Sequence, residues 1–201
     1  METFNITQAT KCLYQSNLSL FTVKTLRDMF HMPSDDTFYL YIRKLIRLHI
    51  LEKLERGIYI IKDRPPHEYN IANILHAPSY ISFETALNFY GILSQFPYEI
   101  TSATVGKSIQ KTIHDTMYSY AHIQPSLFFG YQKKDGHLIA EPEKALLDQL
   151  YFAARGLRQF PIDEYDLSRI DTSRFSSYLS RVPKTKQFIS KMQQLSSVLH
   201  V

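Results

Sequence analysis

Five cationic side chains near the end of the first third of the chain have the types and spacing needed to bind phosphate. They are Arg43, Lys44, Arg47, Lys53 and Arg56. Guanidinium and ammonium groups bind the phosphates of a nucleic-acid backbone, which positions the protein on the duplex. We expect Arg43 and Arg47 to contact mainly phosphates, and Lys53 and Arg56 to reach the minor groove or flanking phosphates.

A second line of side chains on the same segment has the spacing of base-reading residues. Thr37, Tyr41 and Lys44 follow one another at intervals of four and three, so a helix would place them in one row, where they could contact base edges or the shape of a groove. Tyr41 could also belong to the core. Asp35 and Asp36 count against DNA binding, because carboxylates repel phosphates unless they face donors or serve only as caps.

The sequence predicts a helix over 34–49 that carries these residues. Ser34 is a favoured N-cap, and two acidic residues occupy the first turn, where the helix dipole favours negative charge. An apolar stripe follows the helical period, so one face should pack while the other exposes cations. The stripe comprises Phe38, Ile42, Leu45 and His49, widened by Tyr41 and Leu48.

The segment after this helix predicts a β-hairpin. Residues 51–54 form its first strand, 55–57 a tight turn that contains glycine, and 58–62 a β-branched return strand. A helix with a basic outer face followed by a basic hairpin is the second half of a winged helix-turn-helix.

Two further helices precede the basic segment. Thr3 or Asn5 can cap a first helix that runs through Ser16, and Thr22 can cap a second helix over 23–32. Pro33 follows directly and cannot continue that helix, so residues 32–34 are the predicted turn between the second and third helices. We therefore expect a winged helix-turn-helix DNA-binding domain over 1–64.

Residues 67–201 are predicted to form a second, small α+β domain with antiparallel strands and a helical, basic C-terminus. Pro65 and Pro66 form the natural linker. Helices are predicted over 67–76, 142–155 and 184–199. Another predicted helix is capped by Ser82 and ends at Gly91, and the region from 161 onward is largely helical. Predicted strands cover 99–105, 117–123, 127–131 and 138–140.

Composition and charge narrow the classes of function. The 201-residue chain is 44% hydrophobic and 21% charged, which suits one large or two small packed domains. Its net charge of +4 is divided unevenly, since residues 1–64 contribute +3 and residues 167–201 contribute +5. With one cysteine, no long apolar segment and no signal-peptide pattern, we expect a cytoplasmic protein without a membrane span.

Catalytic and metal-binding patterns are weak, so we expect no enzyme activity, metal or cofactor. His114, Asp115, His122 and Glu141 are the residues that a nucleic-acid-processing enzyme would need, but no two of them have the spacing of ligands on a helix. Glu141 and Glu143 flank Pro142 at a predicted helix start, where the dipole explains them. Lys144 and Asp148 are four residues apart and could form an ion pair along that helix. Such a pair contributes only a few tenths of a kcal/mol to stability.

The sequence resembles the antitoxin and transcriptional-regulator family of AbiE-type abortive-infection systems over roughly residues 10–160. The resemblance lies in SYISFETALNFYGILSQFP, ITSATVG, LFFGY and IAEPEKALLDQLY, and in the ending RGIYII of the predicted hairpin. Family members often have glycine at the position of His49, where histidine can adopt the left-handed conformation only at a cost.

The resemblance implies a transcriptional repressor that binds inverted repeats in its own promoter and acts as the antitoxin of a type IV toxin–antitoxin or phage-defence system. Its second domain would oppose a co-encoded nucleotidyltransferase-like toxin, generally without a stable complex. The DNA contacts fall on the seven positions already named, whereas Ser82, Phe83, Ala86 and the segment 141–148 match as scaffold. The alternative is an antitoxin or adaptor that binds a protein partner directly, with DNA binding secondary.

Overall fold

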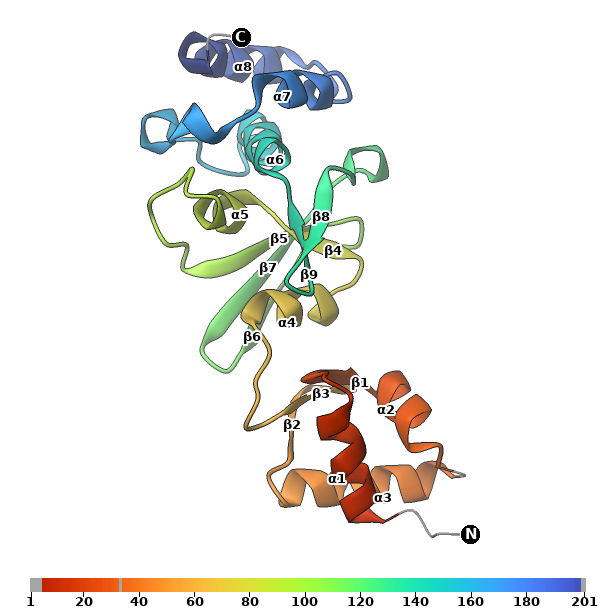
Figure 1. Ribbon diagram of the computed structural model, residues 1–201. Coiled ribbons are helices and arrows are strands. Elements are labelled where there is room, and N and C mark those ends of the chain that lie inside the picture. Colours follow the sequence, from red (N-terminus) through yellow and green to blue (C-terminus); the bar gives the residue numbers. More distant parts are fainter. Residues whose placement is uncertain (1–4, 33, 200–201) are drawn as a thin grey trace. The chain divides into compact units, whose positions relative to one another are not determined.

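The computed structural model describes residues 5–32 and 34–199, which form a mixed α+β structure (Figure 1). The chain divides into two compact units, residues 1–71 and 72–201. The division falls inside helix α4, shortly after Pro65 and Pro66.

The first unit contains three helices and a three-stranded antiparallel sheet. The helices are α1 (Ile6–Gln15), α2 (Val23–Phe30) and α3 (Asp35–Arg47), and the strands are β1 (Leu20–Thr22), β2 (Leu51–Glu55) and β3 (Ile58–Ile61). The strand order is β1-β3-β2. β1 was not predicted, because three residues are too few to show an alternation of apolar and polar side chains. Its extended conformation depends on pairing with β3.

The helices begin where the sequence predicts. The side chains of Asn5, Thr22 and Ser34 each accept a hydrogen bond from a backbone N–H in the first turn of the following helix. Each cap satisfies one N–H that has no partner inside the helix. The alternative first cap, Thr3, and the predicted turn residue Pro33 lie outside the described residues.

The core of the first unit follows the predicted stripe of α3 only in part. Phe38, Ile42 and Leu45 are fully buried, together with residues of the other helices and strands. The prediction is wrong for His49, which is exposed, and for Leu48, which is 51% exposed. Both residues follow the last turn of α3, so the helical period no longer sets the direction of their side chains.

His49 forms the sharp connection between α3 and the hairpin. Its φ of 57° is left-handed, a conformation that favours the glycine often found here in the family that the sequence resembles. The backbone N–H of Ile50 then donates to the carbonyl oxygen of Leu45 at 3.0 Å. This bond satisfies a carbonyl at the C-terminal end of the helix. The chain therefore turns directly from α3 into β2.

The second unit is built on a six-stranded sheet of order β6-β7-β5-β4-β9-β8. The predicted antiparallel arrangement is wrong in part, because β4 pairs with β9 and β5 pairs with β7 in parallel. The strands are β4 (Ser79–Ile81), β5 (Glu99–Thr104), β6 (Ile109–Ile113), β7 (Thr116–His122), β8 (Tyr131–Lys134) and β9 (His137–Ala140). β6 was missed, and the predicted strand 127–131 is wrong because a 3₁₀ turn, Pro125–Leu127, occupies its start.

Helices cover both faces of this sheet (Figure 1). The second half of α4 (Glu68–Leu75) is fastened to one face, where Tyr120 donates from its hydroxyl to the carbonyl oxygen of Ala72 at 2.7 Å. Helices α5 (Phe83–Phe89) and α6 (Pro142–Ala154) lie on the other face. Helices α7 (Thr172–Leu179) and α8 (Lys186–Leu199) pack against α6 in turn.

α6 is buried on all sides and not along one stripe, because α5, α7 and α8 surround it. Beyond the predicted Ala145, Leu146, Leu150 and Ala153, its polar side chains are also buried. Within residues 5–32 and 34–199, none of the helices combines the length and the apolar character that crossing a bilayer requires.

Lys144 and Asp148 form a buried ion pair and not the weak surface pair that was expected. Asp148 also accepts hydrogen bonds from the hydroxyls of Tyr80 at 2.9 Å and Ser82 at 2.8 Å. Burial lowers the pKa of the Lys144 amine, while the Asp148 carboxylate opposes that shift. Ser82 occupies the predicted N-cap position of α5, but its hydroxyl serves this buried cluster and does not cap the helix.

Candidate nucleic-acid interface

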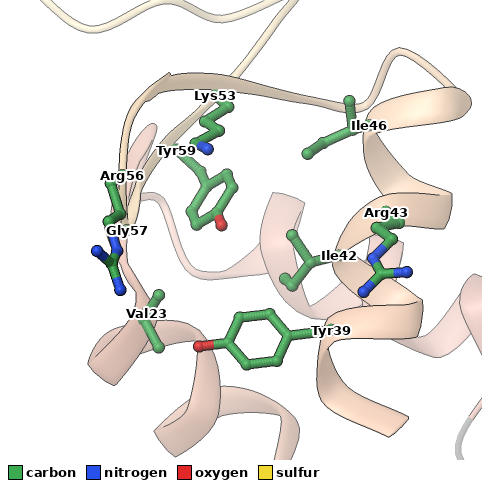
Figure 2. Close-up of a pocket in the computed structure, with 9 residues that line it drawn as sticks. All are labelled: Val23, Tyr39, Ile42, Arg43, Ile46, Lys53, Arg56, Gly57 and Tyr59. Atoms are coloured by element: carbon green, nitrogen blue, oxygen red, sulfur yellow. The ribbon is translucent and has the colours of Figure 1, made fainter. Parts of the chain in front are cut away.

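A groove of about 700 Å³ lies between α3 and the β2–β3 hairpin (Figure 2). Arg43 enters it from α3, Lys53 from β2, and Arg56 from the hairpin turn. We call this the cationic groove. Its lining residues are Val23, Tyr39, Ile42, Arg43, Ile46, Lys53, Arg56, Gly57 and Tyr59.

The floor of the cationic groove is apolar and belongs to the folded core. Ile42 and Tyr59 are buried, and Figure 2 shows both side chains directed into the hollow. The exposed side chains of Arg43, Lys53 and Arg56 lie around this floor. Among the described residues that line the groove, three carry positive charge and none carries negative charge.

The hairpin turn is fastened to the start of α2. The backbone N–H of Val23 donates to the carbonyl oxygen of Gly57 at 3.0 Å. Gly57 has a φ of 84°, a conformation that a residue with a side chain rarely adopts. The turn can therefore bend tightly beside α2, which holds the neighbouring Arg56 at the groove.

Asp35 forms an ion pair within the first unit. Its carboxylate accepts a hydrogen bond from the Arg27 guanidinium at 2.6 Å, an ion pair between α2 and α3. The same guanidinium lies 4.5 Å from the ring centroid of Phe38 and 5.5 Å from that of Tyr39. One of the two carboxylates that counted against DNA binding is thus balanced by a nearby cation.

No protein-family model matches this sequence, and no curated protein matches it.

The predicted DNA-binding residues separate into three groups. Arg43, Lys53 and Arg56 line the cationic groove. Lys44 and Arg47 are exposed on α3 but do not line it. The two remaining residues have partners inside the first unit.

Thr37 and Tyr41 are both half-buried. The Thr37 hydroxyl lies 2.8 Å from that of Ser34 in the helix cap, and Thr37 also lines a shallow second hollow on α3. Tyr41 packs against the core, which is the alternative that the sequence left open. Neither side chain is presented to the outside as fully as the cations of α3.

Two exposed residues of α3 were missed by the sequence interpretation. Tyr39 lines the cationic groove, and Leu40 lines the second hollow. Their spacing to Arg43, four and three residues, could have revealed them, because those intervals place side chains on one helix face. Neither carries a charge, and neither belongs to the predicted apolar stripe.

Three of the residues considered for catalysis lie in a turn or form hydrogen bonds within the second unit. Asp115 lies in the turn between β6 and β7, and His122 contacts the Gly106 carbonyl through Nδ1 at 2.8 Å. Glu141 accepts a hydrogen bond from the Tyr178 hydroxyl. Among the described residues, no cluster of three histidine, cysteine or acidic side chains could hold a metal ion.

Proposed function

We propose that the first unit binds double-stranded DNA as a winged helix. In this reading α2 and α3 form the helix-turn-helix, α3 enters the major groove, and the β2–β3 hairpin is the wing. The element order α1-β1-α2-α3-β2-β3 supports the proposal, as does a sheet in which the hairpin is completed by a strand between the first two helices.

The observation that carries the proposal is the meeting of three cations from separate elements at one groove. Arg43, Lys53 and Arg56 could each neutralise a phosphate while the apolar floor keeps their backbones in place. Counterion release would then make the affinity fall with salt, with a slope near 0.9 for each phosphate contact. Lys44 and Arg47 extend the positive charge along α3.

We further propose that the chain is a cytoplasmic transcriptional repressor that autoregulates its own promoter through inverted repeats. It would be the antitoxin of an AbiE-like toxin–antitoxin or phage-defence system, and its second unit would oppose a nucleotidyltransferase-like toxin without a stable complex. The family resemblance supports this part. The proposal includes no chemical step and no cofactor.

The test measures binding to DNA from immediately upstream of the gene and to a scrambled duplex, by fluorescence anisotropy between about 50 and 200 mM salt. The variant Arg43→Ala/Lys53→Ala/Arg56→Ala should weaken binding and reduce the salt slope by up to about 0.9 for each lost contact. Lys11→Ala, an exposed cation of α1 outside the groove, is the matched control. A triple variant that binds like the native chain would contradict the proposal.

A second candidate function is binding of a protein partner by the second unit. The side chain of Phe96 is 85% exposed and that of Tyr98 fully exposed beside a hollow of about 350 Å³. Exposed aromatic residues of this kind are common at interfaces. Co-purification of a neighbouring gene product in a defined ratio, abolished by Phe96→Ala/Tyr98→Ala but not by the groove variants, would favour this candidate.

A further inference from the structure

The outward side of α3 carries a row of exposed residues opposite its buried stripe. Asp36, Leu40, Arg43 and Arg47 are all exposed and recur at intervals of four, three and four. At about 100° per residue, these positions fall within roughly 60° of one another. We call them the outer stripe.

Leu40 is out of place on this surface. It is 62% exposed, although its neighbours on the outer stripe are charged. It lines a hollow of about 400 Å³ with Asp36, Thr37, Tyr39 and Arg43. The major groove offers an apolar partner of matching size, the C5-methyl group of thymine.

Asp36 also has an unusual setting for a DNA-facing helix. Asp35 is paired with Arg27, whereas Asp36 is exposed one turn before Leu40 and lines the same hollow. A carboxylate repels phosphates but accepts a hydrogen bond from a base amino group, in particular N4 of cytosine. Its position therefore favours contact with a base edge.

We propose that Leu40 reads a thymine methyl group and Asp36 reads a cytosine amino group in the DNA site. This inference rests on the proposed DNA-binding function and adds which bases the site contains. Asp36 and Leu40 are separated by about 6 Å along the helix axis, and stacked bases by about 3.4 Å. The thymine and the cytosine consequently lie within about two base pairs of each other.

The experiment first selects the preferred site of the full chain from a randomised duplex library. Each thymine in that site is then replaced by deoxyuridine, which removes only the methyl group. Replacement of a single thymine that Leu40 contacts should weaken binding about fourfold, the value of one buried methyl group. With Leu40→Ala, the thymine and deoxyuridine duplexes should bind equally.

Leu48→Ala is the matched control for Leu40, because Leu48 is a 51% exposed leucine at the end of the same helix, away from the outer stripe. It should retain the full discrimination between thymine and deoxyuridine. Asp36→Ala should lower the ratio of specific to non-specific binding at a cytosine within two base pairs of that thymine. It should also raise affinity for the scrambled duplex, since a negative charge is lost.

The outcomes separate this inference from the proposed function. Salt-dependent binding of the selected site, with no thymine sensitive to deoxyuridine and no change of specificity in Asp36→Ala, would overturn the base assignment while leaving DNA binding intact. Failure of the native chain to bind any duplex would refute the proposed function and the base assignment with it.

Discussion

The backbone N–H of Val23 donates to the carbonyl oxygen of Gly57 at 3.0 Å, which joins the first residue of α2 to the turn of the hairpin. The bond links two segments that are distant in sequence, and Arg56 precedes Gly57 directly. The direction of one groove cation thus depends on a main-chain contact with another element.

Gly57→Ala should lower both stability and DNA affinity. A Cβ at this position would meet Val23 Cγ2 only at 3.7 Å, so the cost arises from the φ of 84° and not from a clash. We expect the free energy of unfolding of the first unit to fall by about 1–2 kcal/mol. Hydrogen exchange of the β3 amides in the full chain measures this change.

The effect of Gly57→Ala on DNA binding should depend on Arg56. If the turn acts by positioning that side chain, the two substitutions are non-additive, and Gly57→Ala has little further effect in an Arg56→Ala background. Additive losses would show that the turn contributes to binding by another route.

His49→Gly should stabilise the first unit. The native φ of 57° is unfavourable for a residue with a side chain, and glycine removes that penalty at the expense of a more flexible unfolded chain. We expect a gain of up to about 1 kcal/mol in the free energy of unfolding. His49→Val, with a β-branched side chain, should lower it by a larger amount, and equal effects of the two substitutions would contradict the argument.

Asp148→Ala should destabilise the second unit more than Lys144→Met. Asp148 pairs with Lys144 and accepts from the hydroxyls of Tyr80 and Ser82, so its loss removes one acceptor from three buried donors. Only the Lys144 amine keeps another acceptor among these groups, the Tyr80 hydroxyl at 2.9 Å. Breaking a buried pair in this way costs about 3–5 kcal/mol. Lys144→Met leaves both hydroxyls bonded to the carboxylate. Urea denaturation of both variants gives the comparison, and the reverse order would refute it.

The second unit should lose stability between pH 10 and pH 12. Burial, together with the hydrogen bond to Glu141, raises the pKa of Tyr178 from 10.0 to about 12. The folded chain therefore retains a proton that the unfolded chain releases, so the stabilisation is complete below pH 10 and disappears as the pH approaches 12. Tyr178→Phe should reduce this alkaline loss in urea titrations, whereas Tyr98→Phe, at a fully exposed tyrosine, should not.

The sequence predicted α3 and the hairpin well because their signals are local. Ser34 caps the helix, Gly57 permits the turn, and the β-branched residues from Ile58 onward favour a strand. Each of these features depends on a few neighbouring residues. The left-handed conformation of His49 was raised only by the family resemblance, in which glycine often occupies this position.

The sequence predicted poorly what depends on distant pairing. β1 and β6 form their hydrogen bonds with β3 and β7, and no local sequence pattern predicts these two strands. The parallel pair of β5 and β7 was missed for the same reason, since strand direction follows from the path of the whole chain. The burial of Lys144 follows from helices packed around α6, which a single amphipathic stripe cannot reveal.

The sequence predicted the cationic residues of the candidate interface but not the uncharged residues beside them. Arg43, Lys53 and Arg56 were identified from their charge and element type, and they do line one groove. Tyr39 and Leu40 were missed because they lie outside the predicted apolar stripe and carry no charge, so neither the core pattern nor the charge pattern identified them. The position of Leu40 relative to the buried stripe of α3 marks it as an outward residue, which its side-chain type alone does not.

All four residues of β3 are buried, and β1 and β2 flank the strand on its two sides. The arm that carries Lys53 and Arg56 is therefore rigid before any ligand arrives. Little disorder remains to be lost when a duplex is engaged, so calorimetry should record a heat-capacity change no larger than the contacted surface accounts for. If the arm binds DNA as proposed, preformed surfaces would dock, and the ends of a few side chains would decide the selectivity.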